Sequence, residues 1–304
     1  MDPPSDRSNR TSRTPIPRIF HHGVRMNSEL ARLLAEAGVS SRVGWQDVIL
    51  VQNIAPVPPP AGCSGVGGWE RGFNLVVLDR GTPAYFCKCR AAGDAALQRD
   101  TAMRIHLGQS PSRNLSVPTA QGAVSDRIAV QVSPFIRGSH YGRVVSKQST
   151  TTYLETIRVI LKGVGELCDF FEGGGLGQTG KATSIDLAAA ARTSLELIAP
   201  LVPLDTLLFD AISATLRDAG AVLSRSQHGD LWWRNLLLTD DQVWAIDFEG
   251  FGLVQVPLYD DLTLLSSTLA LRPGQHGGIV ERLAASNAES SACRRILRSR
   301  AMWE

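Results

Sequence analysis

The first half of the chain contains short apolar runs that are separated by turn residues. Runs of this kind are typical of β-strands. They lie at residues 48–51, 73–78, 84–89 and 127–132. Residues 79–83 (DRGTP) join the second run to the third, and a short polar link that contains a glycine predicts a β-hairpin.

Most of the chain after Gly138 has apolar residues at helical spacing instead. Together with two segments of the first half, the expected helices lie at residues 27–36, 94–107, 152–171, 185–199, 204–219, 258–270 and from 278 onward. Asp94 is placed to cap the second of these helices and Gly108 to end it. Two short strands are expected at 236–238 and 243–246. A β-rich half followed by a larger helical half predicts an α+β fold with two lobes.

Composition and charge exclude several classes of protein. A hydrophobic content of 43% and a charged content of 20% are ordinary for a soluble globular protein. A formal net charge of +2 does not indicate a nucleic acid or an anionic membrane as a partner. No apolar run reaches the roughly 18 residues of a membrane span, and five cysteines without regular spacing argue against a disulfide framework. We therefore expect a protein of the reducing cytoplasm.

Three regions are expected along the chain. Residues 1–25 are rich in charged residues, Ser, Thr and Pro but lack an apolar stretch, which excludes an ordinary signal peptide and predicts a disordered leader. Residues 26–135 should form the N-terminal lobe, and residues 136–304 the C-terminal lobe.

The segment from residue 227 to residue 249 carries the candidate chemistry, in the sequence QHGDLWWRNLLL followed by WAIDFE. Asp230 and Asn235 are five positions apart, and Asp247 comes twelve residues after Asn235. Phosphoryl transfer needs a carboxylate near the acceptor hydroxyl and oxygen ligands for the Mg²⁺ that bridges the phosphates. A short loop can place Asp230 and Asn235 on one side of a cleft, and a strand that ends at Asp247 presents a second ligand opposite. The spacing agrees with the kinase catalytic loop, and Asp-Phe-Glu stands in the place of Asp-Phe-Gly.

This segment resembles the aminoglycoside phosphotransferase and choline kinase superfamily, in which a glycine replaces the arginine of the protein-kinase His-Arg-Asp. The resemblance implies a bilobal protein-kinase-like fold that uses ATP and Mg²⁺ to phosphorylate a hydroxyl of a small molecule. It implies that Asp230 is the catalytic base and that His228 braces the catalytic loop. Asn235 and Asp247 would be the Mg²⁺ ligands. Asp261 falls where the family has an aspartate that supports this loop.

The same resemblance implies that the N-terminal lobe binds ATP. Lys88, in the second hairpin strand, would pair with the α- and β-phosphates, and Asp100 on the next helix would be its partner. The family normally has glutamate there, and an aspartate is one methylene shorter, so the pair requires a closer helix. Strand alternation turns Lys88 away from Cys87 and Cys89, which we expect to be buried, but leaves open whether Lys88 faces a cleft or water.

Two glycine-rich segments allow more than one interpretation. The cluster at residues 62–72 fits a phosphate-covering loop and nearly as well a flexible connector; its candidate phosphate-binding residues are Gly65, Gly67 and Gly68. Residues 175–182 (GLGQTGKA) come close to a P-loop. Ala182 stands where that motif needs a hydroxyl for Mg²⁺, and a helix precedes the segment, so we expect a loop between helices.

The acceptor itself is not indicated by the sequence, and neither is the oligomeric state. Trp232 and Trp233 could line the acceptor site or pack in the interior. A catalytically silent binding protein with the same fold is the alternative to an enzyme. A protein kinase is less favoured, because Ala-Pro-Glu and a long activation segment are missing after Asp247.

Overall fold

The computed structural model describes residues 28–39, 48–51, 72–174, 184–198, 210, 214–218, 220–272, 282 and 286–301. Several predictions lie outside these residues: the leader, the cluster with Gly65, Gly67 and Gly68, the segment 175–182 and most of the helix expected at 204–219.

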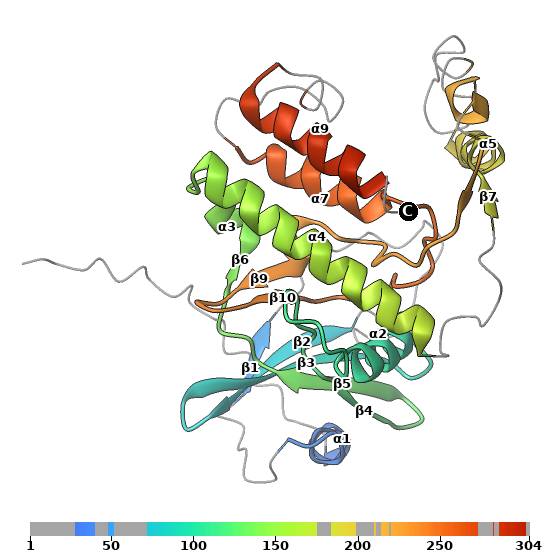
Figure 1. Cartoon of the computed structure of the whole chain (residues 1–304). Helices are drawn as coiled ribbons and strands as arrows, with labels where there is room; N and C mark the ends of the chain where they lie inside the picture. The colour runs from blue at the N-terminus through green and yellow to red at the C-terminus, as the bar shows by residue number, and fades with distance from the viewer. Residues whose placement is uncertain are drawn as a thin grey trace, which may run out of the picture.

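The N-terminal lobe is built on a five-stranded antiparallel sheet with the strand order β1-β2-β3-β5-β4. Its strands are β1 Val48–Val51, β2 Phe73–Asp79, β3 Thr82–Ala91, β4 Gln121–Val124 and β5 Ile128–Pro134. The predicted hairpin is confirmed as β2 and β3. Helices α1 (Ser28–Glu36) and α2 (Ala95–Leu107) lie on opposite faces of the sheet (Figure 1).

Strand β3 separates the core of this lobe from the interface between the lobes, because successive side chains of a strand point to opposite faces. Cys87 and Cys89 are fully buried, as expected, and pack with the leucines of α1. Lys88 points the other way, where its ammonium group contacts carboxylates of α2 and of the C-terminal lobe. The strand therefore presents Lys88 to the interface between the lobes rather than to water.

Helix α2 begins and ends where the sequence predicts. The side chain of Asp94 accepts a hydrogen bond of 2.8 Å from the backbone N–H of Leu97, and the helix ends before Gly108. This placement brings the buried face of α2 against β4, β5 and helix α4 of the other lobe.

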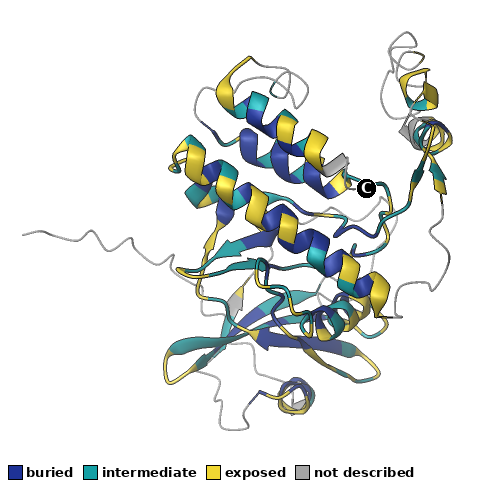
Figure 2. Cartoon of the chain, in the orientation of Figure 1, coloured by how far each residue is buried: buried dark blue, intermediate teal, exposed yellow. Residues whose placement is uncertain are grey.

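Among the described residues of the C-terminal lobe, three helices of eleven residues or more pack around one core. These are α4 Thr150–Gly173, α7 Tyr259–Leu269 and α9 Ala288–Ala301. On the side of the five-stranded sheet, a small sheet with the order β10-β9-β6 carries the predicted catalytic segment (Figure 1); its strands are β6 Ser139–His140, β9 Leu236–Leu238 and β10 Val243–Ala245. Buried residues gather where the helices face one another, and exposed residues lie along their outer sides (Figure 2).

Several short elements were not predicted from the sequence pattern. They are β4, β6, helix α3 Tyr141–Val145, and the pair formed by β7 Ser184–Asp186 and β8 Ala221–Leu223. The helix expected from residue 185 therefore begins later, as α5 Leu187–Ile198. Strands of two or three residues are too short to show a period, and their pairing depends on distant segments. Within the part of the chain that the structure describes, no helix is both long and apolar enough to cross a membrane.

Candidate active site

The catalytic loop at residues 227–235 closes on itself through Asn235. A 3₁₀ turn, η2 Trp233–Asn235, brings this side chain back to Asp230. Asn235 Nδ2 donates hydrogen bonds to the main-chain oxygen of Asp230 at 2.9 Å and to its carboxylate Oδ2 at 2.8 Å. Asn235 is buried, whereas Asp230 is exposed. The loop thus fixes a carboxylate that remains accessible to an incoming hydroxyl group.

The loop that contains Asp247 lies directly against the catalytic loop. Asp247 follows β10 with a left-handed backbone (φ 70°), a conformation that is concentrated at functional sites when the residue is not glycine. The N–H of Ile246 donates to the main-chain oxygen of Asn235 at 3.0 Å. A Cβ atom on Gly229 would lie only 2.7 Å from the main-chain oxygen of Gly250. The hydrogen bond holds the loops face to face, and the missing side chain of Gly229 leaves room for their close approach.

Lys88 links the two lobes by ion pairs. Its Nζ lies 3.0 Å from Asp100 Oδ2 and 2.6 Å from Asp247 Oδ1. The other oxygen of Asp100 accepts a hydrogen bond of 2.8 Å from the N–H of Phe248. The shorter side chain of Asp100 thus reaches both the lysine of one lobe and the loop of the other.

Lys88 and Asp100 are both charged at neutral pH. Burial alone would lower the pKa of Lys88, but the carboxylates of Asp100 and Asp247 outweigh burial and raise it. Burial alone would raise the pKa of Asp100, yet the charges of Lys88 and Arg104 lower it on balance. Buried charges persist when they are paired in this way.

His228 packs as a neutral ring beneath the loop. Its ring centroid lies 4.7 Å from that of Phe248 and 6.4 Å from that of Phe251. Burial lowers the pKa of His228 to about 4, against the opposing charges of Asp247 and Asp100. A neutral imidazole enclosed by aromatic rings fits a bracing role better than a role in proton transfer.

Asp260 supports the catalytic loop, one position before Asp261, for which the family resemblance implied this role. Asp260 Oδ1 accepts a hydrogen bond of 3.1 Å from the N–H of Gly229, and Oδ2 accepts one from the N–H of His228. Both aspartates lie in the first turn of α7, where successive side chains point about 100° apart. Burial raises the pKa of Asp260 to about 6, although its backbone hydrogen bonds oppose the shift.

Burial and the charge of Asp247 raise the pKa of two further carboxylates, those of Asp230 and Glu249. Burial raises the pKa of Asp230, the hydrogen bond from Asn235 opposes the shift, and Asp247 adds to it. Glu249, the last residue of Asp-Phe-Glu, has a pKa that is raised by burial and then by Asp247. Negative charge at this point of the molecule favours a bound cation.

The oxygen atoms of the site fit Mg²⁺. Because Asn235 uses Nδ2 to contact Asp230, its Oδ1 is the amide atom available to a cation. Asp247 contributes a carboxylate of which Lys88 contacts only Oδ1. Among the described residues, no group of three or more His, Cys, Asp or Glu side chains could hold a metal ion. Mg²⁺ is usually bound by one or two protein oxygens together with phosphates and water, which is what Asn235 and Asp247 offer.

The two tryptophans of the loop have different environments. Trp233 packs so closely on α3 that a Cβ atom on Gly142 would clash with its ring, and it contacts the main core. The guanidinium of Arg234 lies 4.8 Å from the ring centroid of Trp232 and 4.9 Å from that of Trp233. Trp233 is therefore a packing residue, and half-buried Trp232 is the one that remains a candidate for the acceptor side.

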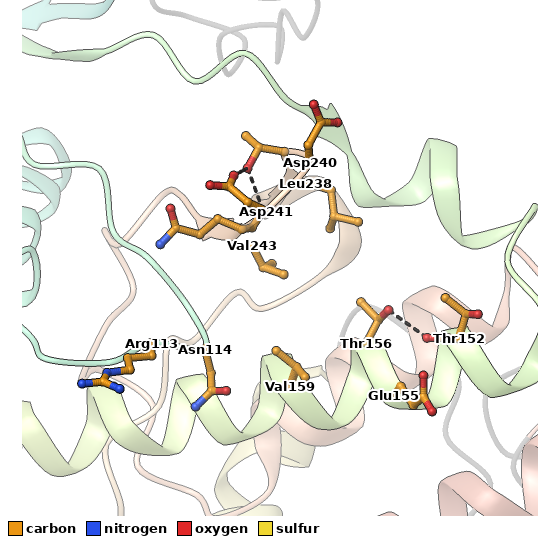
Figure 3. Close-up of a pocket in the computed structure, with 12 residues that line it drawn as sticks. Arg113, Asn114, Thr152, Glu155, Thr156, Val159, Leu238, Asp240, Asp241 and Val243 are labelled. Atoms are coloured by element: carbon orange, nitrogen blue, oxygen red, sulfur yellow. Dashed lines mark hydrogen bonds between the residues drawn. The ribbon is translucent and has the colours of Figure 1, made fainter.

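A separate hollow of about 310 Å³ lies between the turn that joins β9 to β10 and helix α4 (Figure 3). Val159 lines it from α4, Leu238, Asp240 and Val243 line it from the side of β9 and β10, and Arg113 lies at one end. None of the predicted site residues lines this hollow, so it is not the candidate active site.

Comparison with solved structures identifies the fold. The macrolide 2′-phosphotransferase MphH from Brachybacterium faecium, an apoenzyme, matches with a TM-score of 0.53 at 14% identity, over 90% of this chain and 89% of that chain. The GDP and kanamycin complex of APH(2″)-IIia matches with a TM-score of 0.52 at 13% identity, over 80% of this chain and 79% of that chain. The chain has their fold. The bilobal kinase-like architecture expected from the motif is thus confirmed.

No protein-family model matches the sequence, and no curated protein matches it. Because the identity with the solved structures is so low, the likeness shows the fold alone. The roles of individual residues therefore depend on the geometry described above.

Proposed function

We propose that the chain is an ATP- and Mg²⁺-dependent O-phosphotransferase that moves the γ-phosphate to a hydroxyl group of a small molecule. The observation that carries this proposal is the contact of Lys88 with both Asp100 and Asp247, beside the closed loop of Asp230. Phosphoryl transfer depends mainly on positioning and on stabilising charge. Lys88, Asp230 and Asp247, which come from both lobes, can position the reactants and stabilise charge.

Asp230 would orient the acceptor hydroxyl and accept its proton. Its carboxylate is exposed and is held by Asn235, and its raised pKa increases its affinity for a proton. His228 and Asp260 would keep the loop in place without touching the acceptor. Asn235 and Asp247 would hold Mg²⁺, which when bound neutralises charge on the transferring phosphate.

Lys88 would bind the phosphates of the nucleotide from the N-terminal lobe. Its ammonium is charged, half-buried and held at the lobe interface by Asp100. The identity of the base is a separate question, because one structure of similar fold contains GDP. GTP therefore belongs beside ATP in any test.

The acceptor would be a hydroxylated small molecule. The two solved structures of similar fold are named for a macrolide phosphotransferase and for a kanamycin complex. Macrolides and aminoglycosides therefore come first among acceptors to test, followed by sugars and by choline-like alcohols.

The test is a screen of hydroxylated small molecules with the purified chain, Mg²⁺ and either ATP or GTP. Nucleoside diphosphate release is measured, and transfer is verified by the mass of the phosphorylated product. We expect product with at least one acceptor, and none with EDTA or with the Asp247→Asn variant. Tight Mg²⁺-dependent nucleotide binding without product from any acceptor would instead indicate a silent binding protein.

A further inference from the structure

Helix α2 places two charged residues on its buried face, one turn apart. Asp100 is 1% exposed and Arg104 is 3% exposed. Arginine is rarely buried to this extent unless its charge and its hydrogen bonds are satisfied. Asp100 has a role in the proposed site, whereas the catalytic motifs give no reason for a buried cation at Arg104.

The guanidinium of Arg104 ties α2 to two other segments. Its Nε donates a hydrogen bond of 2.9 Å to the main-chain oxygen of Pro118, and its Nη1 donates one of 3.1 Å to Gln131 Oε1. The same Nη1 lies 3.8 Å from Asp100 Oδ2. Gln131 is the residue of β5 directly opposite Lys88 in the β3–β5 register. Arg104 therefore helps to fix the distance between α2 and the part of the sheet that carries the lysine.

The side chain of Asp100 needs such support because it is short and has several partners. Its Oδ1 accepts from Phe248 N–H, and its Oδ2 contacts both Lys88 and Arg104. An aspartate reaches Lys88 only when α2 lies close to the sheet. Two residues of α2 bond it to Gln131 of β5: Thr101 Oγ1 accepts a hydrogen bond of 3.0 Å from Gln131 Nε2, and Arg104 donates to Gln131 Oε1. Of these two residues, Arg104 is the one that also lies within ion-pair distance of Asp100.

The balance of charges around Asp100 also supports a positioning role for Arg104. Lys88 and Arg104 face the carboxylates of Asp100 and Asp247, so two cations balance two anions. If Lys88 turned toward phosphates without a second cation nearby, Asp100 would be left as a buried anion with weaker compensation. A buried charge that loses its partner is strongly destabilising. Arg104 keeps Asp100 paired while Lys88 serves the nucleotide.

We propose that Arg104 is a positioning residue of the phosphotransferase site, which holds the short Asp100 carboxylate where it can orient Lys88. The residue acts through Asp100 and does not touch the substrates. This proposal rests on the proposed function and adds to it a residue that no motif identifies.

The test compares kcat and the KM for Mg·ATP in wild type and four variants. Arg104→Leu removes the guanidinium, and we expect kcat to fall at least about tenfold, by a larger factor than KM rises. In the double variant with Asp100→Glu, the longer carboxylate should reach Lys88 unaided and recover at least about fivefold of the loss. Arg99→Leu removes the same charge from an exposed position of α2, and we expect its kcat to stay within about twofold of wild type.

Arg104→Lys keeps the charge but not the paired hydrogen bonds of the guanidinium, and we expect kcat to fall about threefold or more. If thermal melting shows that Arg104→Leu does not fold, the Arg104→Lys variant takes its place in the test. Wild-type kcat in a folded Arg104→Leu or in Arg104→Lys would overturn the proposal. So would a double variant no faster than Arg104→Leu, because a purely structural anchor would not be replaced by a longer acid.

Failure of the proposed function can be told apart from failure of this inference. If wild type transfers phosphate to no acceptor, the proposed function is wrong, and the variants are compared by calorimetric titration with Mg·ATP. We then expect Arg104→Leu to weaken the affinity for Mg·ATP at least about threefold. The double variant with Asp100→Glu should restore this affinity. Unchanged affinity in Arg104→Leu would overturn the role of Arg104.

Discussion

Replacing Gly229 by alanine tests how the two loops of the site are held face to face. Gly229 has a φ of +84°, and an L-residue with a Cβ atom pays about 1–2 kcal/mol in the left-handed region. The new Cβ would also lie 2.7 Å from the main-chain oxygen of Gly250, so the loop with Asp247 has to move. A displacement of about 1 Å at a catalytic group can lower the rate by about 10²-fold. We therefore expect Gly229→Ala to lower kcat by about 10- to 100-fold.

Two other glycines of the same lobe provide matched controls. Gly220 and Gly252 both have a φ of +73°. A Cβ atom on Gly220 would meet nothing within 4 Å, and one on Gly252 would meet only the ring of Phe171, at 3.4 Å. Gly220→Ala and Gly252→Ala should lower the free energy of unfolding by about 1–2 kcal/mol and leave kcat within about twofold of wild type.

The assay is steady-state kcat at saturating Mg·ATP and acceptor, beside thermal melting of each variant. If Gly229→Ala keeps the kcat of the two controls, the contact between the loops does not position the site. If all three variants lose activity equally, backbone strain alone explains the loss, and the reasoning from the 2.7 Å approach is refuted.

Two predictions concern Asp260. Asp260→Asn replaces one of the two oxygens that accept hydrogen bonds from the catalytic loop by an amide donor, so we expect kcat to fall about tenfold or more. Wild-type kcat of this variant in a steady-state assay would contradict the role of Asp260. The second prediction concerns pH. Because burial raises the pKa of Asp260 from 3.8 to about 6, the folded chain binds this proton more tightly than the unfolded chain. As pH rises from 4 to above 6, the free energy of unfolding of wild type, measured by urea denaturation, should therefore fall by up to about 3 kcal/mol relative to that of Asp260→Asn. If the free energies of unfolding of the two proteins change with pH in parallel, the pKa of Asp260 is not raised.

The parts of the fold that follow from local sequence were predicted well. The hairpin of β2 and β3 and the capped helix α2 depend on residues close in sequence, namely a glycine-containing link and Asp94. The β7–β8 pair was missed because each strand has three residues and its partner lies far along the chain. Periodicity contains no information about such pairing.

The candidate site shows the same division. Asp230 and Asn235 could be recognised because their chemistry depends on a spacing of five residues within one loop. The role of Asp260 was missed, because the sequence does not show how α7 is rotated about its axis relative to the catalytic loop. Arg104 was missed because its partners come from segments that the sequence does not place near it; its position four residues after Asp100, on the same helix face, was the one available signal.

The most direct test of the central claim is phosphate transfer by Asp230→Asn, measured with the acceptor found for wild type. Asparagine keeps an oxygen for the hydrogen bond from Asn235, so the loop can close, but it cannot accept the proton of a hydroxyl group. We predict that kcat falls by about 10²- to 10⁴-fold while the Kd for Mg·ATP stays within about threefold. Transfer at the wild-type rate by this variant would contradict the account.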